Sequence, residues 1–439
     1  MLGLDVGTSR TKAVMVDRDG RQVGAASVPT PFARRGDAVE MSVADLRAAV
    51  QTVLERLGRG RGTVAAVGVA GVAESGAPLD NRRRPLAPII AWSDPRGAET
   101  VDLLERHFGD GLSRLIGQRI RAVSSVAKLG WLLDHGVTGV RRWLGVPELC
   151  VFLLTTAEVT EHSLAARTGC YDVARLRYLP EVAERVGFDI AVFPPVASAG
   201  RAMGLVSAAA SAWSGLPEGA TVTLAGHDHL AGVDGCGAAD GDLVNSVGTA
   251  ETVIGSHAAL PDIERALALR AAMTVRPGPN GWATLASAAR AGVVLDQVAG
   301  ALGQPPDVLD ELAQDAEAAD AASVLADVER GQAPRLPPGL PGAVWKGALQ
   351  ALAERTADAA DRASALTGSP GRMVVFGGGS RSRPWLEAKA SAVAVPVWRS
   401  TVAEAVARGA ALRAGMAAGW WPSPSDAPRA PLEPVHSSA

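Results

Sequence analysis

The chain has 439 residues and a formal net charge of −3, so it is long enough for two or three domains that each bury an apolar core. The lack of a basic excess argues against nucleic acid or an anionic membrane as the main partner and favours small ligands. The three cysteines, Cys150, Cys170 and Cys236, have no paired spacing, which argues against a disulfide framework or a structural zinc site. Asp5 interrupts the apolar start, and no stretch is long enough to span a membrane, so we expect a cytoplasmic protein.

The N-terminal segment predicts a hairpin. Apolar residues alternate on both sides of Asp5-Val6-Gly7-Thr8 up to Val16, a pattern typical of two strands joined by a glycine turn. The stretch 17–20 is a natural turn, and residues 22–28 are expected to form a third strand. The chain is therefore predicted to begin as an antiparallel meander.

A helix and a further strand are expected next. Ser42 and Asp45 match a capping box, and an apolar stripe at helical spacing follows up to Leu57. Residues 64–69 then read as a buried strand that runs into Gly71. This order of elements predicts a mixed α/β domain.

Residues 85–190 carry weaker patterns. Helical character is expected at 129–133 and 164–171, and a loop at 193–195. Residues 221–225 return as a strand that ends in Gly226-His227-Asp228-His229, after which a helix rich in small residues is expected from Leu230.

The second half repeats the design of the first. Val-Gly-Thr-x-x-Thr occurs at 6–11 and again at 247–252, where strands at 242–246 and 251–254 flank the turn Gly248-Thr249. A duplication at this period indicates two similar lobes around a cleft rather than a solenoid. We place the boundary near residue 238, which gives an N-terminal lobe at 1–238 and a C-terminal lobe at 239–421.

The C-terminal part continues the α/β pattern. A long helix is expected at 344–367, followed by a buried strand at 373–376 and by Gly377-Gly378-Gly379. Thr401 to Glu404 is predicted to cap a helix that runs to about Ala418, with Gly409 and Gly415 permitting close packing. The tail 422–439, rich in Pro and Ser, is predicted to be mobile.

The two glycine-threonine turns are candidate phosphate sites. Glycine lets backbone N–H groups converge on an anion, and threonine adds a hydroxyl donor. Asp5 precedes the first turn and Lys12 follows it, so two facing turns are predicted to hold a polyphosphate. The sequence contains neither the Gly-x-x-x-x-Gly-Lys-Ser/Thr loop nor a Rossmann fingerprint.

Three further segments could carry chemistry. Asp228 could accept the proton of a phosphoryl-acceptor hydroxyl, or it could simply cap the next helix. His227 and His229 are expected to point to opposite sides of an extended segment, which argues against a metal site built from both. Trp92 to Arg96 offers an aromatic face, a carboxylate and a guanidinium for a polyol, or else forms a surface loop with a salt bridge. Glu74 is a hydroxyl acceptor or a solvent-facing carboxylate.

Five segments resemble, in their order, motifs of the FGGY carbohydrate kinases, and the resemblance covers nearly the whole chain. These segments are Leu4 to Lys12, Trp92-Ser93-Asp94-x-Arg96, Gly226-His227-Asp228, Ser246 to Thr249, and Phe376 to Ser382.

The resemblance implies the fold of the actin, Hsp70 and sugar-kinase superfamily: an α/β chain of two ribonuclease-H-like lobes whose mixed sheets are flanked by helices, with ATP and sugar in the cleft. It implies ATP-dependent phosphorylation of a sugar hydroxyl, with a ketose of the xylulose, ribulose or deoxy-ketose type favoured and with Mg²⁺ present. Asp228 would be the catalytic base, and Asp5 would help hold Mg²⁺ through water. The other residues implied are Gly7, Thr8, Thr11, Lys12, Gly248, Thr249, Gly377, Gly378 and Ser382 for ATP, and Glu74, Trp92, Asp94, Arg96 and His227, with Asp228, for the sugar.

Departures from the family pattern leave alternatives open. Residues 71–73, before Glu74, lack the Gln-Met-His of xylulokinases and the Arg-Glu pair of glycerol kinases. A pocket with Glu74 and Trp92 but no matching arginine favours a ketose, and glycerol or another polyol is the alternative acceptor. Glu251 must point away from the phosphates. A catalytically silent sugar and nucleotide sensor is the rival outside enzymes, and the oligomeric state is open, with a homodimer as one alternative.

Overall fold

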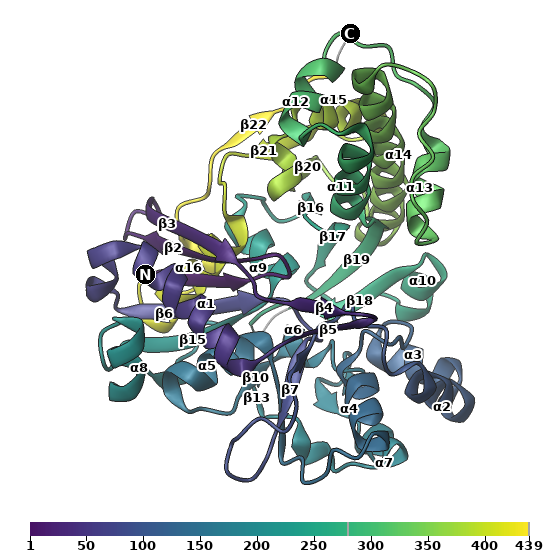
Figure 1. Ribbon diagram of the computed structural model, residues 1–439. Helices are drawn as coiled ribbons and strands as arrows, with labels where there is room; N and C mark the ends of the chain where they lie inside the picture. Colours follow the sequence, from purple (N-terminus) through teal and green to yellow (C-terminus); the bar gives the residue numbers. More distant parts are fainter. Residues whose placement is uncertain (279–280, 438–439) are drawn as a thin grey trace.

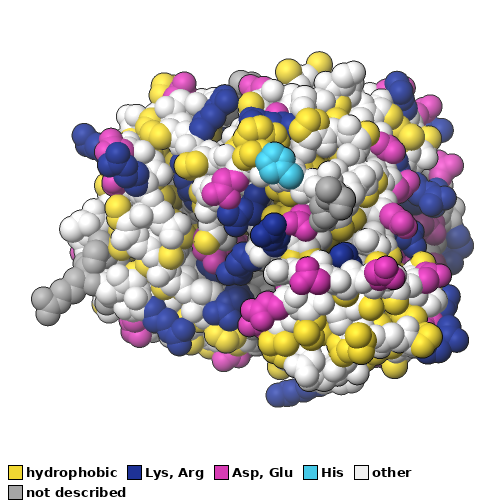
Figure 2. Space-filling model, turned by 90° about the horizontal axis from the view of Figure 1, so that it is seen from above, with side chains coloured by type: hydrophobic (Ala, Val, Ile, Leu, Met, Phe, Trp, Pro, Cys, Tyr) yellow, Lys and Arg dark blue, Asp and Glu magenta, His cyan; other side chains and the backbone are white. Residues whose placement is uncertain are grey.

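The computed structural model describes residues 1–278 and 281–437, with side chains for all of these except residues 59–61. Two mixed sheets form the centres of two regions of the molecule (Figure 1). Charged side chains of both signs are interspersed on the face seen from above (Figure 2). Within the described residues no helix is long and apolar enough to cross a membrane.

The first sheet contains the predicted N-terminal hairpin. β1 runs between antiparallel β2 and parallel β6, and β6 in turn pairs in parallel with β15. Apolar side chains of β1 and β6 are fully buried, as expected for central strands covered on both faces. The strands, in sheet order, are β14 (Gly204–Leu205), β15 (Thr221–His227), β6 (Ala66–Gly71), β1 (Leu2–Val6), β2 (Arg10–Val16) and β3 (Gln22–Pro29).

The second sheet repeats the central pairing of the first. β16 lies between antiparallel β17 and parallel β20, as β1 lies between β2 and β6. The predicted duplication of the hairpin is therefore confirmed at the level of strand pairing. The strands, in sheet order, are β18 (Ala271–Val275), β19 (Trp282–Ala289), β17 (Glu251–His257), β16 (Leu243–Val247), β20 (Met373–Phe376), β21 (Val397–Ser400) and β22 (Leu432–Pro434).

Helices cover both sheets. The capping box at Ser42 and Asp45 is formed at the start of α1, and the predicted long helix is α14. Around the first sheet lie α1 (Val43–Arg56), α5 (Val146–Thr155), α8 (Ala208–Ser214) and α9 (Asp228–Gly235). With the second sheet lie α10 (Ile263–Ala268), α11 (Ala291–Leu302), α12 (Pro306–Ala313), α13 (Ala322–Glu329), α14 (Pro341–Thr367) and α15 (Arg383–Ala392).

A third region of short elements lies mainly between β6 and β15, where the sequence patterns were weak, and it also includes two strands within 33–41 that precede α1. It has its own core around Leu104, Leu129 and Phe193. Its helices are α2 (Ala98–Phe108), α3 (Asp110–Ile116), α4 (Ser125–Asp134), α6 (His162–Ala165) and α7 (Pro180–Val186). Its strands are β4 (Ala33–Arg35), β5 (Ala38–Met41), β8 (Ile89–Ile90), β7 (Gly76–Leu79), β9 (Arg142–Gly145), β10 (Thr160–Glu161), β13 (Val196–Ala197), β11 (Tyr171–Asp172) and β12 (Arg177–Tyr178).

The helix α16 (Ala405–Ala417) belongs to the second half of the chain but packs on the first sheet and on α9 (Figure 1). Its small residues allow backbone contact: a Cβ added at Gly409 would collide with the carbonyl of Ala231, and one at Gly235 with the carbonyl of Ala405. The two halves are thus joined by a tightly packed pair of helices.

The prediction of a mobile tail is wrong. β22 pairs with β21 through Trp398 and Pro434, and Ala427 and Ala430 are buried. Arg408 of α16 also donates to the carbonyl of Pro428 at 2.6 Å. These contacts hold the tail against the protein; its last two residues, 438–439, lie outside the described part.

Two local predictions also need correction. The helix expected at 164–171 ends at Ala165 because the Thr168 hydroxyl donates to the Ala165 carbonyl and Gly169 takes a positive φ of 81°. The helix predicted after Thr401 exists as α16, but no side chain caps it, since the Thr401 hydroxyl donates to the Pro431 carbonyl instead.

Candidate active site

The first glycine-threonine turn connects β1 to β2. The Gly7 amide closes it by donating to the Arg10 carbonyl at 3.0 Å, and the Thr8 hydroxyl accepts from the indole N–H of Trp92 at 2.9 Å. Asp5, at the end of β1, is 5% exposed. Its Oδ1 is buried without a hydrogen-bond partner among the described residues, and burial raises its pKa to about 7.

The second turn faces the first. The Gly248 amide donates to the Ala250 carbonyl at 3.1 Å, as Gly7 does to Arg10. The hydroxyls of Ser9 in the first turn and Thr249 in the second lie 3.4 Å apart. The structure therefore brings together the two turns that the sequence repeats, as two facing turns around an anion require.

Two residues of β2 next to the first turn differ in their burial and in their partners. Thr11 is fully buried, and its hydroxyl is 3.0 Å from that of Thr30, so it supports the turn from behind. Lys12, the next residue on β2, lies instead beside Glu404, with Nζ and Oε2 2.6 Å apart. No local pattern indicates this partner, because Glu404 is nearly four hundred residues away.

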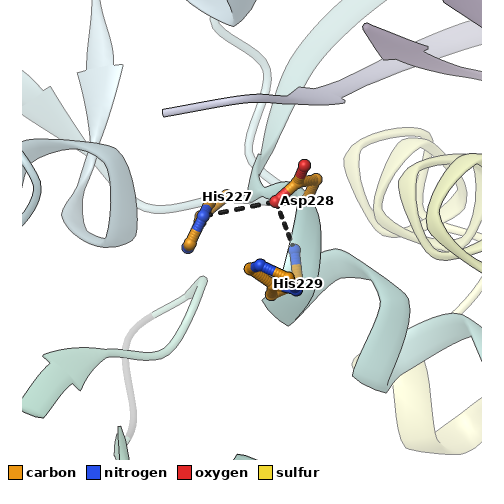
Figure 3. A group of neighbouring side chains, drawn as sticks. All are labelled: His227, Asp228 and His229. Atoms are coloured by element: carbon orange, nitrogen blue, oxygen red, sulfur yellow. Dashed lines mark hydrogen bonds and ion pairs between the residues drawn. The ribbon is translucent and has the colours of Figure 1, made fainter. Parts of the chain in front are cut away.

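Asp228 is the first residue of α9, directly after β15. Its Oδ1 accepts from the backbone N–H of His229 at 2.7 Å and lies 3.2 Å from Nε2 of His227. Figure 3 shows the other carboxylate oxygen pointing away from both histidines. Burial, and secondarily the charge of Glu74, raise the pKa of Asp228 to about 7. A carboxylate with a pKa near neutral pH is suited to act as a general base.

The two histidines do not point to opposite sides as predicted. Because the strand ends at His227 and the helix starts at Asp228, the rings meet edge to face with centroids 5.1 Å apart. Burial lowers the pKa of His229 to about 4 and that of His227 well below its usual range. Both imidazoles are therefore neutral at pH 7, and potential ligand atoms of the three residues lie within 4.8 Å of one another.

Glu74 is within electrostatic range of Asp228, and its side chain is only 8% exposed, so the solvent-facing alternative is wrong. Its backbone has a positive φ of 62°, which is uncommon for a residue with a side chain. Its Oε1 accepts from Nε of Arg167 at 2.7 Å, and Nη1 of Arg167 donates to Gln118 Oε1 at 2.6 Å. The expectation of a pocket without a matching arginine is therefore wrong: Arg167 comes from the segment 164–171, 93 residues away, which was expected to be helical and gave no sign of this contact.

The segment around Trp92 forms a buried support rather than an open polyol surface. Asp94 is 1% exposed and accepts from Nε of Arg96 at 2.8 Å and from the Val39 amide at 2.8 Å. Arg96 also pairs with Glu40 at 2.6 Å and stacks over the ring of Trp131. The predicted salt bridge exists, but in the interior, so Asp94 has its hydrogen-bonding capacity engaged by the protein.

The triple glycine lies next to the second turn because β20 pairs with β16. Gly377 has a φ of 104°, and a Cβ there would collide with the carbonyl of Val247. Gly378 begins a 3₁₀ turn. Ser382 caps α15 by accepting from the Trp385 amide and donates to Asp310, so its hydroxyl has protein partners.

Two other residues lie next to the second turn. Glu251 points away from the turn, as a site for phosphates requires. Its side chain is buried, forms an ion pair with Lys389 and accepts a 2.7 Å hydrogen bond from Thr356. Gly292 of α11 was missed by the sequence reasoning; a Cβ there would collide with the backbone of Gly248 and Thr249. A lone glycine inside a helical pattern gave no signal of this contact.

Family models and known proteins that are similar to this chain cover most of its length. Residues 1–235 match the family model for the FGGY family of carbohydrate kinases, N-terminal domain, and residues 243–418 match the C-terminal domain. The chain is 28% identical over 275 residues to L-fuculokinase of Escherichia coli (strain K12), covering 58% of this chain and 56% of that protein. It is 28% identical over 459 residues to a glycerol kinase of Aromatoleum aromaticum, covering 96% of this chain and 90% of that protein. The match thus spans little more than half of the fuculokinase.

Solved structures share the fold over the whole chain. A xylulose kinase from Rhodospirillum rubrum aligns with a TM-score of 0.81 at 23% identity, covering 100% of this chain and 94% of that one. A glycerol kinase from Plasmodium falciparum aligns with a TM-score of 0.80 at 16% identity, again covering 100% of this chain and 94% of that one. At such identities the likeness establishes the two-lobed α/β fold.

Proposed function

Because the chain belongs to the FGGY family of carbohydrate kinases, we propose that it transfers the γ-phosphoryl group of ATP to a hydroxyl of a sugar of the ketose type. The observation that carries the proposal is the free carboxylate oxygen of Asp228, held beside two facing glycine-threonine turns. The names of similar proteins, L-fuculokinase and xylulose kinase, support a ketose acceptor. Glycerol or another polyol is the alternative acceptor, since glycerol kinases are also among the relatives.

Asp228 is the general base in this proposal. Its free oxygen accepts the proton of the sugar hydroxyl as that oxygen attacks the γ-phosphorus and ADP leaves. The backbone N–H of His229 holds Oδ1 of the carboxylate, and the neutral His227 ring lies beside the same oxygen, with Nε2 3.2 Å away. Electrostatic positioning of the phosphates supplies the larger part of the rate.

ATP is assigned to the cleft between the two turns. The amides of Gly7 and Gly248 close the two turns, so the backbone N–H groups that follow them, from Thr8 and Thr249 onward, are assigned to the phosphates. Lys12, paired with Glu404, lies next to the first turn. Gly377 and Gly378 offer a backbone surface without side chains for the adenosine, next to β16. Ser382 and Thr11 act by holding these turns, since their hydroxyls are bonded within the protein.

The residues present fit a magnesium ion. Asp5 keeps one buried carboxylate oxygen without a protein partner near the phosphate turn, and oxygen ligands shared with phosphate and water are what Mg²⁺ prefers. Asp5 would hold the ion, which when bound neutralises phosphate charge. Burial is the main cause that raises the pKa of Asp5, and the nearby carboxylates of Asp228 and Glu404 raise it further.

The acceptor sugar is assigned to the pocket around Glu74. The Glu74–Arg167 pair is nearly buried, with side chains 8% and 9% exposed, and presents both an acceptor and donors close to Asp228. Trp92 joins this pocket to the first turn through Thr8. Asp94 and Arg96 support its wall from the interior. Rotation of the lobes about Gly237 and Gly241, whose φ angles are 93° and 86°, would exclude water.

The decisive experiment measures ADP release with Mg²⁺ and ATP against a panel of ketoses, aldoses, polyols and sugar acids. The purified protein is compared with Asp228→Ala and with a matched control, Asp37→Ala, which changes an exposed carboxylate on the loop after β4. We expect sugar-dependent turnover that falls by about 10²–10⁴-fold in Asp228→Ala alone. If the unaltered protein binds sugar and nucleotide but shows no turnover, the proposed kinase activity is refuted and a sensor is favoured.

The proposal includes a cytoplasmic location and a small-molecule acceptor rather than a nucleic acid. A homodimer is an alternative to a monomer, which light scattering of the purified protein decides.

A further inference from the structure

Three side chains that can ligate a metal ion meet where β15 ends and α9 begins: His227, Asp228 and His229 (Figure 3). One ligand atom from each residue lies within 4.8 Å of those from the other two. Nε2 of His227 and Oδ1 of Asp228 are 3.2 Å apart. Two ligands of a tetrahedral zinc ion are separated by about 3.3 Å, because Zn–N and Zn–O bonds are about 2.0–2.2 Å long. This pair is therefore already at the spacing that a single ion requires.

The ring nitrogens of both histidines remain available to an ion. His227 is 6% exposed, and its Nδ1 is buried without a hydrogen-bond partner among the described residues. Nδ1 of His229 is 2.9 Å from the Ser246 hydroxyl, and in the described part of the chain Nε2 of His229 has no hydrogen-bond partner. An imidazole with one nitrogen held by the protein and the other left free is the usual arrangement of a metal-binding histidine.

The three residues are partly open to solvent and favour one class of ion. The Asp228 side chain is 24% exposed and His229 is half-buried, so an ion can enter past them. The positive charge of Arg167, which acts on all three residues, is offset by its ion pair with Glu74. Imidazole nitrogen suits zinc, copper and nickel, whereas magnesium prefers oxygen ligands. The group therefore selects a transition metal rather than Mg²⁺.

We propose that His227, Asp228 and His229 bind a divalent transition-metal ion, Zn²⁺ in particular, and that the bound ion inhibits the transfer. The inhibitory part rests on the proposed function of Asp228 as general base, whereas the binding part does not. A cation on Oδ1 favours the charged form of the carboxylate and so weakens the proton affinity of its other oxygen. The ion therefore lowers turnover without occupying the place assigned to ATP.

Calorimetric titration of the purified, metal-free protein with zinc chloride, without ATP or sugar, measures the binding. The unaltered protein is compared with His229→Gln and Asp228→Asn, which each remove one ligand, and with His107→Gln. His107 is a matched control because it is an exposed histidine in the last turn of α2 and lies outside the group. We expect one zinc ion per unaltered chain, an affinity lower by at least about tenfold in the two ligand variants, and no change in His107→Gln.

ADP release at a fixed, saturating concentration of Mg²⁺ and ATP measures the inhibition, with the free zinc concentration set by a chelator. We expect saturating zinc to lower kcat/KM for the acceptor by about tenfold or more in the unaltered protein and in His107→Gln, as loss of part of a general-base contribution predicts. Relative to its own zinc-free rate, His229→Gln should need a zinc concentration higher by the factor that calorimetry gives.

Absence of zinc binding, or an equal affinity in all four proteins, would overturn the inference and leave the kinase function standing. Zinc inhibition of equal strength in every active variant would show that zinc acts through ATP and would overturn the inhibitory role. Absence of turnover on every acceptor would instead refute the proposed function, and the titration would still decide whether the metal site exists. Thermal unfolding shows whether a loss of affinity comes from misfolding, and if His229→Gln is misfolded, Asp228→Asn decides.

Discussion

Replacing Asp228 by Asn should lower turnover by about 10²–10⁴-fold and at the same time stabilise the fold. The folded protein raises the pKa of this carboxyl from 3.8 to about 7, mainly by burial. Above pH 7 the folded state must therefore keep a buried charge that the unfolded chain carries in water at no cost. Asn has nearly the same shape, still accepts the His229 amide, and never ionises.

The magnitude follows from the two pKa values. A carboxyl whose folded pKa lies above its unfolded pKa loses stability progressively as the pH rises from the unfolded to the folded value. Between 3.8 and about 7, at ~1.4 kcal/mol for each pH unit, the loss is on the order of 4 kcal/mol. Asp228→Asn should recover up to this amount at pH 8. The gain should vanish as the pH falls below 4, where Asp228 becomes protonated in both the folded and the unfolded state.

Urea unfolding of the unaltered protein and of Asp228→Asn at pH 8, 6 and 4 measures this gain. Asp37→Asn serves as the control, since its exposed side chain should give no gain at any pH. A gain that does not depend on pH, or no gain at pH 8, would refute the argument that the site holds a destabilised charge for function. Activity assays on the same samples should show a loss of about 10²–10⁴-fold.

Three further outcomes are expected. Below a pH of about 7, kcat/KM should fall about tenfold per pH unit as Asp228 is protonated. Arg167→Met should move this profile to higher pH because Arg167 lowers the pKa of Asp228. An unmoved profile would contradict the electrostatic effect of Arg167 on Asp228. Gly377→Ala should destabilise the protein by about 1–3 kcal/mol and raise the KM for ATP, because its φ is 104°, whereas Gly371→Ala, with open space around its Cβ, should do neither. Lys389→Met should cost about 3–5 kcal/mol in urea unfolding because it leaves Glu251 buried without its cation; a cost below about 1 kcal/mol would show that the pair is not needed.

Much of the framework was determined by the sequence alone. The two hairpins, the capping box at Ser42, the strand that leads to Asp228 and the strand before Gly377 were predicted from local patterns and are confirmed. These features depend on interactions between residues a few positions apart. Apolar and polar residues alternate so that one face of a strand is buried, an N-cap side chain bonds the backbone three residues later, and glycine stands where a turn needs its conformational freedom. The repeat of the glycine-threonine turn also indicated a two-lobed molecule before any contact was known.

Tertiary structure decided which side chains meet at the site. Arg167 reaches Glu74 across 93 residues, Glu404 reaches Lys12 from the far end of the chain, and the tail joins the second sheet through β22. Asp94 was expected to face a polyol and is buried instead. Such pairings depend on how the strands of the sheets are ordered and on the contact between α9 and α16. Local periodicity sets the form of each segment, but the partner of a charge is set by the packing of segments that are distant in sequence, which no local pattern records.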